Sequence, residues 1–251
     1  MAEDFMGPGG GGMAGFAPEA WFWEMPPVTR CWVTACAITS VLVQCKVITP
    51  LQLFYSYRAV LHKSQYWRLF TPFVYFGPLS LDLVFHVYFL QRYSKLLETS
   101  LGHTPSKFAW LLFCAAVALL VISPLASLPF LGSSLSSTLV YVWARRNPQT
   151  HLSFLGLLVF TAPYLPFILM IFSYVIHSTI PKDEILGVIV GHVFWFLEDV
   201  FPGMYGGQRP MDPPGWWKWI FEGRARNDRT ENARLDHEVA AAIQALPRDV
   251  R

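Results

Sequence analysis

The chain has 251 residues, of which 53% are hydrophobic and 14% are charged. A soluble domain carries about 25% charged residues, so this composition argues against a soluble fold and favours a membrane protein. The net charge of +2, without a basic block interleaved with aromatic residues, indicates no nucleic-acid partner. Aromatic residues make up 16% of the chain, as expected where Trp and Tyr anchor helices at the two membrane surfaces.

The chain divides into three parts by composition. Residues 1–20 are acidic and rich in glycine, and we expect them to be disordered. They lack a basic region followed by an apolar core and a cleavage site, so no cleavable signal peptide is predicted. Residues 21–221 are predicted to form one membrane domain that begins with a short interfacial segment. Residues 222–251 are predicted to form a cytosolic tail with a short helix at 231–246, where apolar residues recur at helical spacing.

Six apolar stretches predict six transmembrane helices. They cover approximately residues 31–47, 79–90 with an extension to 97, 108–122, 125–143, 152–176 and 185–201. Several are shorter than the ~20 residues that a membrane span needs. An even number of spans puts both termini on one side. The basic residues that follow the second and fourth spans predict that this side is the cytosol.

Two short motifs stand near the first two spans. Trp67 and Arg68 lie in the loop after the first span, where the indole can anchor at the interface while the guanidinium reaches headgroups or backbone carbonyls. Glu98 and Gly102 close the second span, and a glycine four residues after a carboxylate can end a helix in a tight structural turn.

Polar and small residues inside the predicted spans suggest further roles. Gly187 and Gly191 form a small-xxx-small motif in the sixth span, which lets a neighbouring helix pack closely. Asp82 and His86 lie four residues apart and so share one face of the second span. Together with His192 they are ionisable groups at membrane depth, and we expect them to be structural or to line a cavity.

These motifs, in this order and spacing, resemble the rhomboid superfamily. The Trp-Arg pair, the Glu-x-x-x-Gly turn, the Tyr-Val-Trp run at 141–143 and the GxxxG motif carry the resemblance. Segments 26–32, 88–94 and 141–148 resemble the derlin branch of that superfamily more closely. The resemblance covers roughly residues 21–221 and implies an all-α membrane protein, a six-transmembrane-helix rhomboid-like bundle with both termini in the cytosol.

The resemblance also bears on catalysis. Rhomboid proteases use a serine in the fourth span and a histidine in the sixth. In the register set by the motifs, Gly132 stands at the position of the serine and Glu184 at that of the histidine. The resemblance therefore implies a pseudoprotease that is not an enzyme. An active intramembrane serine protease is the alternative, because a serine-rich run at 133–137 follows Gly132. A small-solute transporter would require an internal repeat, which the sequence does not contain.

What the resemblance implies about function is a role in ER-associated degradation, as a multi-pass protein of the endoplasmic reticulum membrane. Such a protein assists retrotranslocation of misfolded proteins beside a Hrd-type membrane ubiquitin ligase complex and its adaptors. Substrates would meet a groove near spans two and five, in a bilayer whose lipids are thinned around the short spans. Many derlins recruit a cytosolic AAA+ segregase through a Phe/Gly-rich C-terminal motif. No such motif follows Phe221, so we expect indirect recruitment. No CxxC or Cys/His cluster is present, so we predict no metal and no cofactor.

Overall fold

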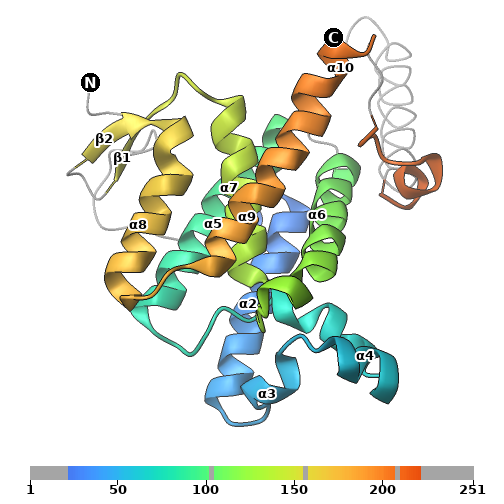
Figure 1. The fold of residues 1–251 in the computed structure, drawn as a ribbon, viewed down its shortest axis with the longest axis vertical. Helices are drawn as coiled ribbons and strands as arrows, with labels where there is room; N and C mark the ends of the chain where they lie inside the picture. The colour runs from blue at the N-terminus through green and yellow to red at the C-terminus, as the bar shows by residue number, and fades with distance from the viewer. Residues whose placement is uncertain (1–21, 102–104, 155–157, 207–209, 222–251) are drawn as a thin grey trace, which may run out of the picture.

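The computed structural model describes residues 22–101, 105–154, 158–206 and 210–221 of the chain. Gly102, the predicted disordered N-terminus and the predicted helix at 231–246 lie outside these residues. Helices dominate the described part (Figure 1). The α-helices are α2 (Pro27–Gln44), α3 (Pro50–Leu53), α4 (Tyr57–Lys63), α5 (Leu81–Ser100), α6 (Pro105–Ala126), α7 (Gly132–Arg146), α8 (Leu165–His177), α9 (Lys182–Trp195) and α10 (Phe201–Met204).

Short 3-10 and π turns and one β-hairpin complete the described elements. The 3-10 turns are η1 (Tyr66–Leu69), η2 (Thr71–Phe73) and η3 (Ala162–Tyr164), and a π turn, η4, covers Phe196–Val200. The hairpin strands are β1 (His151–Phe154) and β2 (Leu158–Thr161), antiparallel with His151 opposite Thr161.

Helix α7 forms the centre of the bundle and contacts α5, α6, α8 and α9 (Figure 1). Most of its residues from Gly132 to Ala144 are buried. The first half of α7 is rich in serine, and such small side chains let neighbouring helices approach where lipid supplies no hydrophobic driving force. The central helix of the bundle is therefore rich in polar side chains. This explains why hydropathy alone predicts the limits of this span poorly.

Several helices suit a membrane by length and composition. Helix α6, with 22 residues, and the segment Lys182–Met204, with 23, are long and apolar enough to cross a bilayer, and Ala162–His177 forms a shorter apolar helix. The family assignment given below and these helices make the chain a helical membrane protein. The count of six spans and the cytosolic side of the termini stay predictions.

The predicted fifth span is wrong in its first half. Residues 152–154 and 158–161 belong to the two strands of the β-hairpin, and helix α8 begins only at Leu165. Two prolines explain the late start. Pro163 lies in the first turn of η3 and Pro166 in the first turn of α8, where a missing N–H does no harm. Further into a longer helix, the same prolines would each remove a hydrogen bond and clash with the preceding turn.

The predicted limits of two other spans also shift. Helix α6 continues through Pro124 to Ala126, and Ser127 then adopts a left-handed φ of 53°, so 127–131 is a connection and not the start of the fourth span. The helical segment of the sixth span ends at Met204, slightly beyond the predicted end near Phe201. The chain continues through the π turn into α10, with Pro202 in its first turn. A π turn inserts an extra residue into the helical hydrogen-bond ladder, which makes room for a proline.

Candidate functional site

Arg68 ties together the long loop between α2 and α5. Its guanidinium donates to the carbonyls of Leu51 at 3.1 Å and Phe54 at 2.8 Å, and its Nε donates to Gln65 at 2.6 Å. These carbonyls lie in and just after the one-turn helix α3, where a helix cannot satisfy its own acceptors. The sequence left two possible partners for this guanidinium, lipid headgroups or backbone carbonyls. In the structure it donates to backbone carbonyls. Trp67 points away, with 55% of its surface exposed, as suits an interfacial anchor.

We expect Arg68→Lys to loosen this loop while the bundle stays folded. A lysine keeps the charge but loses the planar fork that reaches several acceptors at once. Hydrogen bonds from a charged group contribute about 1.5–3 kcal/mol each, so residues 50–71 should exchange their amide hydrogens faster. Hydrogen exchange measured by mass spectrometry tests this, with the exposed Arg58→Lys of the same loop as the control. Equal exchange in the two variants would contradict the role given to Arg68.

Glu98 holds the start of α2 from the far end of α5. One carboxylate oxygen accepts hydrogen bonds from the backbone N–H and the hydroxyl of Thr29, at 2.9 and 2.7 Å. The other accepts from the N–H of Val28 at 3.2 Å. Only 2% of Glu98 is exposed, so these are buried, charge-assisted bonds to the unpaired N–H groups of a helix N-terminus. The carboxylate of the predicted turn motif thus acts as a cap for a different helix.

Gly187 and Gly191 lie where α9 crosses α7. A Cβ added at Gly187 would collide with the carbonyl oxygen of Ser134, and one at Gly191 would lie 2.9 Å from Cβ of Tyr141. Across this contact the hydroxyl of Thr138 donates to the carbonyl of Gly187 at 3.0 Å. Both glycines therefore face a backbone that a larger residue would have to displace.

A small polar cavity lies between α5, α7, α8 and α9. Its polar lining consists of Asp82, His86, Ser133, Ser136, Ser137, Ser173 and Glu184. The volume of about 40 Å³ exceeds the ~10–15 Å³ that a cavity needs to hold one water molecule. Such a concentration of polar side chains among apolar helices is costly in a bilayer and marks a candidate functional site.

The seam between α5 and α8 closes this cavity on one side. Oδ2 of Asp82 lies 3.6 Å from Nε2 of His177 on α8, while Oδ1 lies 3.6 Å from Nε2 of His86 on its own helix. One turn further along, Phe85 and Phe172 meet edge to face at 5.7 Å between ring centroids. We call these two contacts, Asp82–His177 and Phe85–Phe172, the α5–α8 seam. The backbones of α5 and α8 approach each other at few points, so the contact between these helices depends mainly on side chains.

The positions expected for a catalytic dyad hold Gly132 and Glu184. A Cβ at Gly132 would lie 3.0–3.2 Å from the ring of Phe76, so this ring occupies the space that a nucleophile side chain would need. His86 does line the serine-containing cavity, but its ring pairs with Asp82 and packs beside Phe76. Among the described residues of this cavity, no hydrogen bond joins a serine hydroxyl to a histidine.

His192 lies outside this cavity. It lies on an exposed part of α9, where its Nδ1 is 2.7 Å from the hydroxyl of Tyr141. Arg145 donates to the same hydroxyl at 2.9 Å. The depth of His192 along the span was read from the sequence, but the face it occupies depends on how α9 packs against α7.

Two contacts of the site were missed from the sequence. His177 lies just after the predicted fifth span, in the loop before the sixth. Its pairing with Asp82 joins residues almost a hundred positions apart, so the sequence does not reveal it. The cap on α2 carried a partial signal, because the helix begins at Pro27 without a side-chain cap of its own and leaves N–H groups that need an acceptor. The sequence could not say that the acceptor comes from Glu98.

The described residues form a helical membrane protein, and within its polar cavity they join no serine hydroxyl to a histidine. The model of the Der1-like family matches residues 25–215. Derlin-2.1 of Zea mays is 41% identical over 217 residues, covering 82% of this chain and 86% of the relative. Derlin-2.2 of Arabidopsis thaliana is 40% identical (82% and 88%), and a probable derlin-2 homolog of Dictyostelium discoideum is 36% identical over 214 residues (82% and 84%). The chain belongs to the Der1-like family.

Proposed function

We propose that this chain is a non-proteolytic derlin of the endoplasmic reticulum membrane. It assists the movement of misfolded proteins across that membrane during ER-associated degradation, next to a membrane ubiquitin ligase complex of the Hrd type and its adaptors. The observation that supports this best is the polar cavity behind the α5–α8 seam. A polar surface reached through a thin seam between helices offers a translocating polypeptide hydrogen-bond partners at a depth where lipid offers none.

A photo-crosslinking experiment tests this role. A photoreactive residue in place of Phe85 or Phe172 should capture a misfolded luminal substrate during its degradation, because these rings form the seam. The control is the same residue in place of Val117, which is exposed on the outer surface of α6. Substrate captured equally from position 117 would contradict entry through the seam.

Two further measurements on the full chain test its partners and the alternative that it is a protease. We expect the ligase complex to co-purify with the full chain in mild detergent, and the AAA+ segregase to do so only when the ligase is present. A fluorophosphonate probe should label none of the serines at positions 133, 134, 136 and 137. Labelling of any of them, together with cleavage of the substrate, would establish the protease instead.

The length of α8 supports a second part of this proposal, local thinning of the bilayer. Its 13 residues span about 20 Å at 1.5 Å per residue, against about 30 Å of hydrocarbon in a typical bilayer. Helix α8 exposes apolar side chains such as Ile171 and Val175, and a bilayer thins around a lipid-facing helix that is shorter than its hydrocarbon layer. We expect nanodisc-embedded protein to show a depression of several ångströms in the density of the membrane near α8. A uniform thickness around the whole protein would contradict this.

A further inference from the structure

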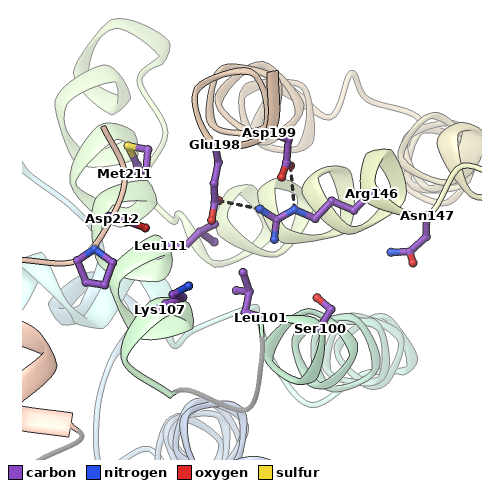
Figure 2. Close-up of a pocket in the computed structure, with 11 residues that line it drawn as sticks. Ser100, Leu101, Lys107, Leu111, Arg146, Asn147, Glu198, Asp199, Met211 and Asp212 are labelled. Carbon is purple, nitrogen blue, oxygen red and sulfur yellow. Dashed lines mark hydrogen bonds and ion pairs between the residues drawn. The ribbon is translucent and has the colours of Figure 1, made fainter. Parts of the chain in front are cut away.

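A second and much larger cavity lies at the opposite end of the bundle from the α5–α8 seam. Its volume is about 540 Å³, within the range of ligand-binding pockets. The ends of α5 and α7, the first turn of α6, the π turn after α9 and the segment 211–213 surround it (Figure 2). Nothing in the proposed function above uses this cavity.

The charged side chains of this cavity differ in whether they have a partner of opposite charge. Arg146 forms ion pairs, with its Nε 2.8 Å from Asp199 and a terminal nitrogen 3.0 Å from Glu198. Lys107 and Asp212 make no hydrogen bond or ion pair with any residue that the structure describes. Figure 2 shows the ends of both side chains turned toward the interior of the cavity. Within the part of the lining that the structure describes, one cation and one carboxylate therefore remain for a ligand.

The charge balance selects the type of ligand. Among the described lining residues, three carboxylates (Glu198, Asp199 and Asp212) face two cations (Lys107 and Arg146), which leaves a net charge of −1. A phosphate dianion alone would meet this excess negative charge. A ligand that carries both a phosphate and an ammonium would satisfy Lys107 with the first and Asp212 with the second.

The lining also distinguishes between kinds of ammonium. A quaternary ammonium such as choline is bound by aromatic faces, whereas a primary ammonium donates up to three hydrogen bonds to oxygen acceptors. Among the described residues that line the cavity none is aromatic, and the side-chain acceptors are carboxylates, the amide of Asn147 and the hydroxyl of Ser100. Ethanolamine fits this lining and choline does not.

The surroundings place the cavity at headgroup depth. Lys107 is followed on α6 by Trp110 and Phe113, and Trp217 packs against both rings at 5.1 and 5.4 Å between centroids. The indole N–H of Trp217 donates to the carbonyl of Ser106, next to Lys107, at 3.0 Å. Tryptophan clusters of this kind mark the membrane–water interface. Leu111 and Met211 add an apolar side to the cavity, suited to the start of an acyl chain.

We propose that this cavity binds a phosphoethanolamine head group, with phosphatidylethanolamine as its source. The phosphate lies on Lys107 and the ammonium on Asp212, while the Arg146 ion pair forms the fixed wall opposite them. Free phosphoethanolamine has the same two charges, so the experiment must separate the lipid from the soluble compound.

Native mass spectrometry of the full, delipidated chain tests the proposal. The protein is titrated with dioleoyl phosphatidylethanolamine, phosphatidylcholine and phosphatidylglycerol, and separately with phosphoethanolamine. We expect phosphatidylethanolamine to bind about tenfold more tightly than the other two lipids, as the loss of one charge-assisted hydrogen bond predicts. Lys107→Gln and Asp212→Asn should each remove most of this preference. Lys182→Gln, an exposed lysine at the other end of α9, should leave it unchanged.

Each outcome decides the question. The expected preference, lost in both variants, supports the lipid site. Phosphoethanolamine that binds as tightly as the lipid, with the same loss in both variants, supports the site and assigns it to a soluble ligand. Equal binding of all three lipids by the unaltered chain overturns the proposal whether or not the variants fold. A preference that survives both substitutions overturns it too.

Discussion

Glu98→Ala is expected to lower the stability of the bundle strongly. The variant leaves the N–H groups of Val28 and Thr29 and the Thr29 hydroxyl without their acceptor in a buried site. At about 1.5–3 kcal/mol for each of these three bonds to a charged group, the free energy of unfolding should fall by about 4.5 kcal/mol or more. Reversible unfolding in bicelles, followed by steric trapping, measures the loss.

A matched control and a double-mutant cycle show whether this loss comes from the cap. Glu24 is an exposed carboxylate beside Lys95, and Glu24→Gln should change the stability by less than about 0.5 kcal/mol. Thr29→Val removes one hydroxyl and should cost about 1–2 kcal/mol in the unaltered chain. In the Glu98→Ala background it should cost almost nothing, because its acceptor is already absent. Additive losses would mean that Glu98 stabilises the protein in some other way.

The sequence predicted the class of this fold and several of its local features. Each of the apolar stretches, the Trp-Arg pair and the GxxxG motif is defined by residues that lie close together in the chain. The sequence alone was therefore enough to recognise them. The limits of the spans were less accurate, because they depend on local events such as the left-handed Ser127 and the late start of α8 at Leu165. The β-hairpin before α8 was missed because a short apolar run has the same composition in a strand and in a buried helix.

The contacts that make up the candidate site were less accessible. Asp82 and His86 were identified as polar groups at membrane depth, but the partner on α8 depends on the packing of two helices that are distant in sequence. Glu198 and Asp199 both pair with Arg146, and this contact depends on where the ends of α7 and α9 lie relative to each other. The sequence shows which polar residues lie within the predicted spans, where their burial in lipid is unfavourable. Which residues pair with them and stabilise them depends on the fold.

Gly187→Ala is expected to disrupt the contact between α7 and α9. The new Cβ would meet the carbonyl oxygen of Ser134 and lie 2.8 Å from Cβ of Ser137, and neither atom belongs to a flexible side chain end. The helices would have to separate, which would also stretch the bond from the Thr138 hydroxyl to the carbonyl of residue 187. Overpacking of this kind costs about 1–3 kcal/mol, from which the better helix propensity of alanine, about 1 kcal/mol, is subtracted.

A series of glycines in one chain makes this prediction sharp. Gly191→Ala meets Tyr141 and Thr138 at 2.9–3.0 Å and should destabilise less than Gly187→Ala, because these contacts are longer than the one between the new Cβ at position 187 and the carbonyl oxygen of Ser134. Gly203→Ala, in α10, has no neighbour within 4 Å of its new Cβ and should be neutral or slightly stabilising. The measurement is again the free energy of unfolding in bicelles. If all three variants had the same stability, α7 and α9 would not pack at the distance described here. The polar cavity between these helices would then have a volume larger than 40 Å³.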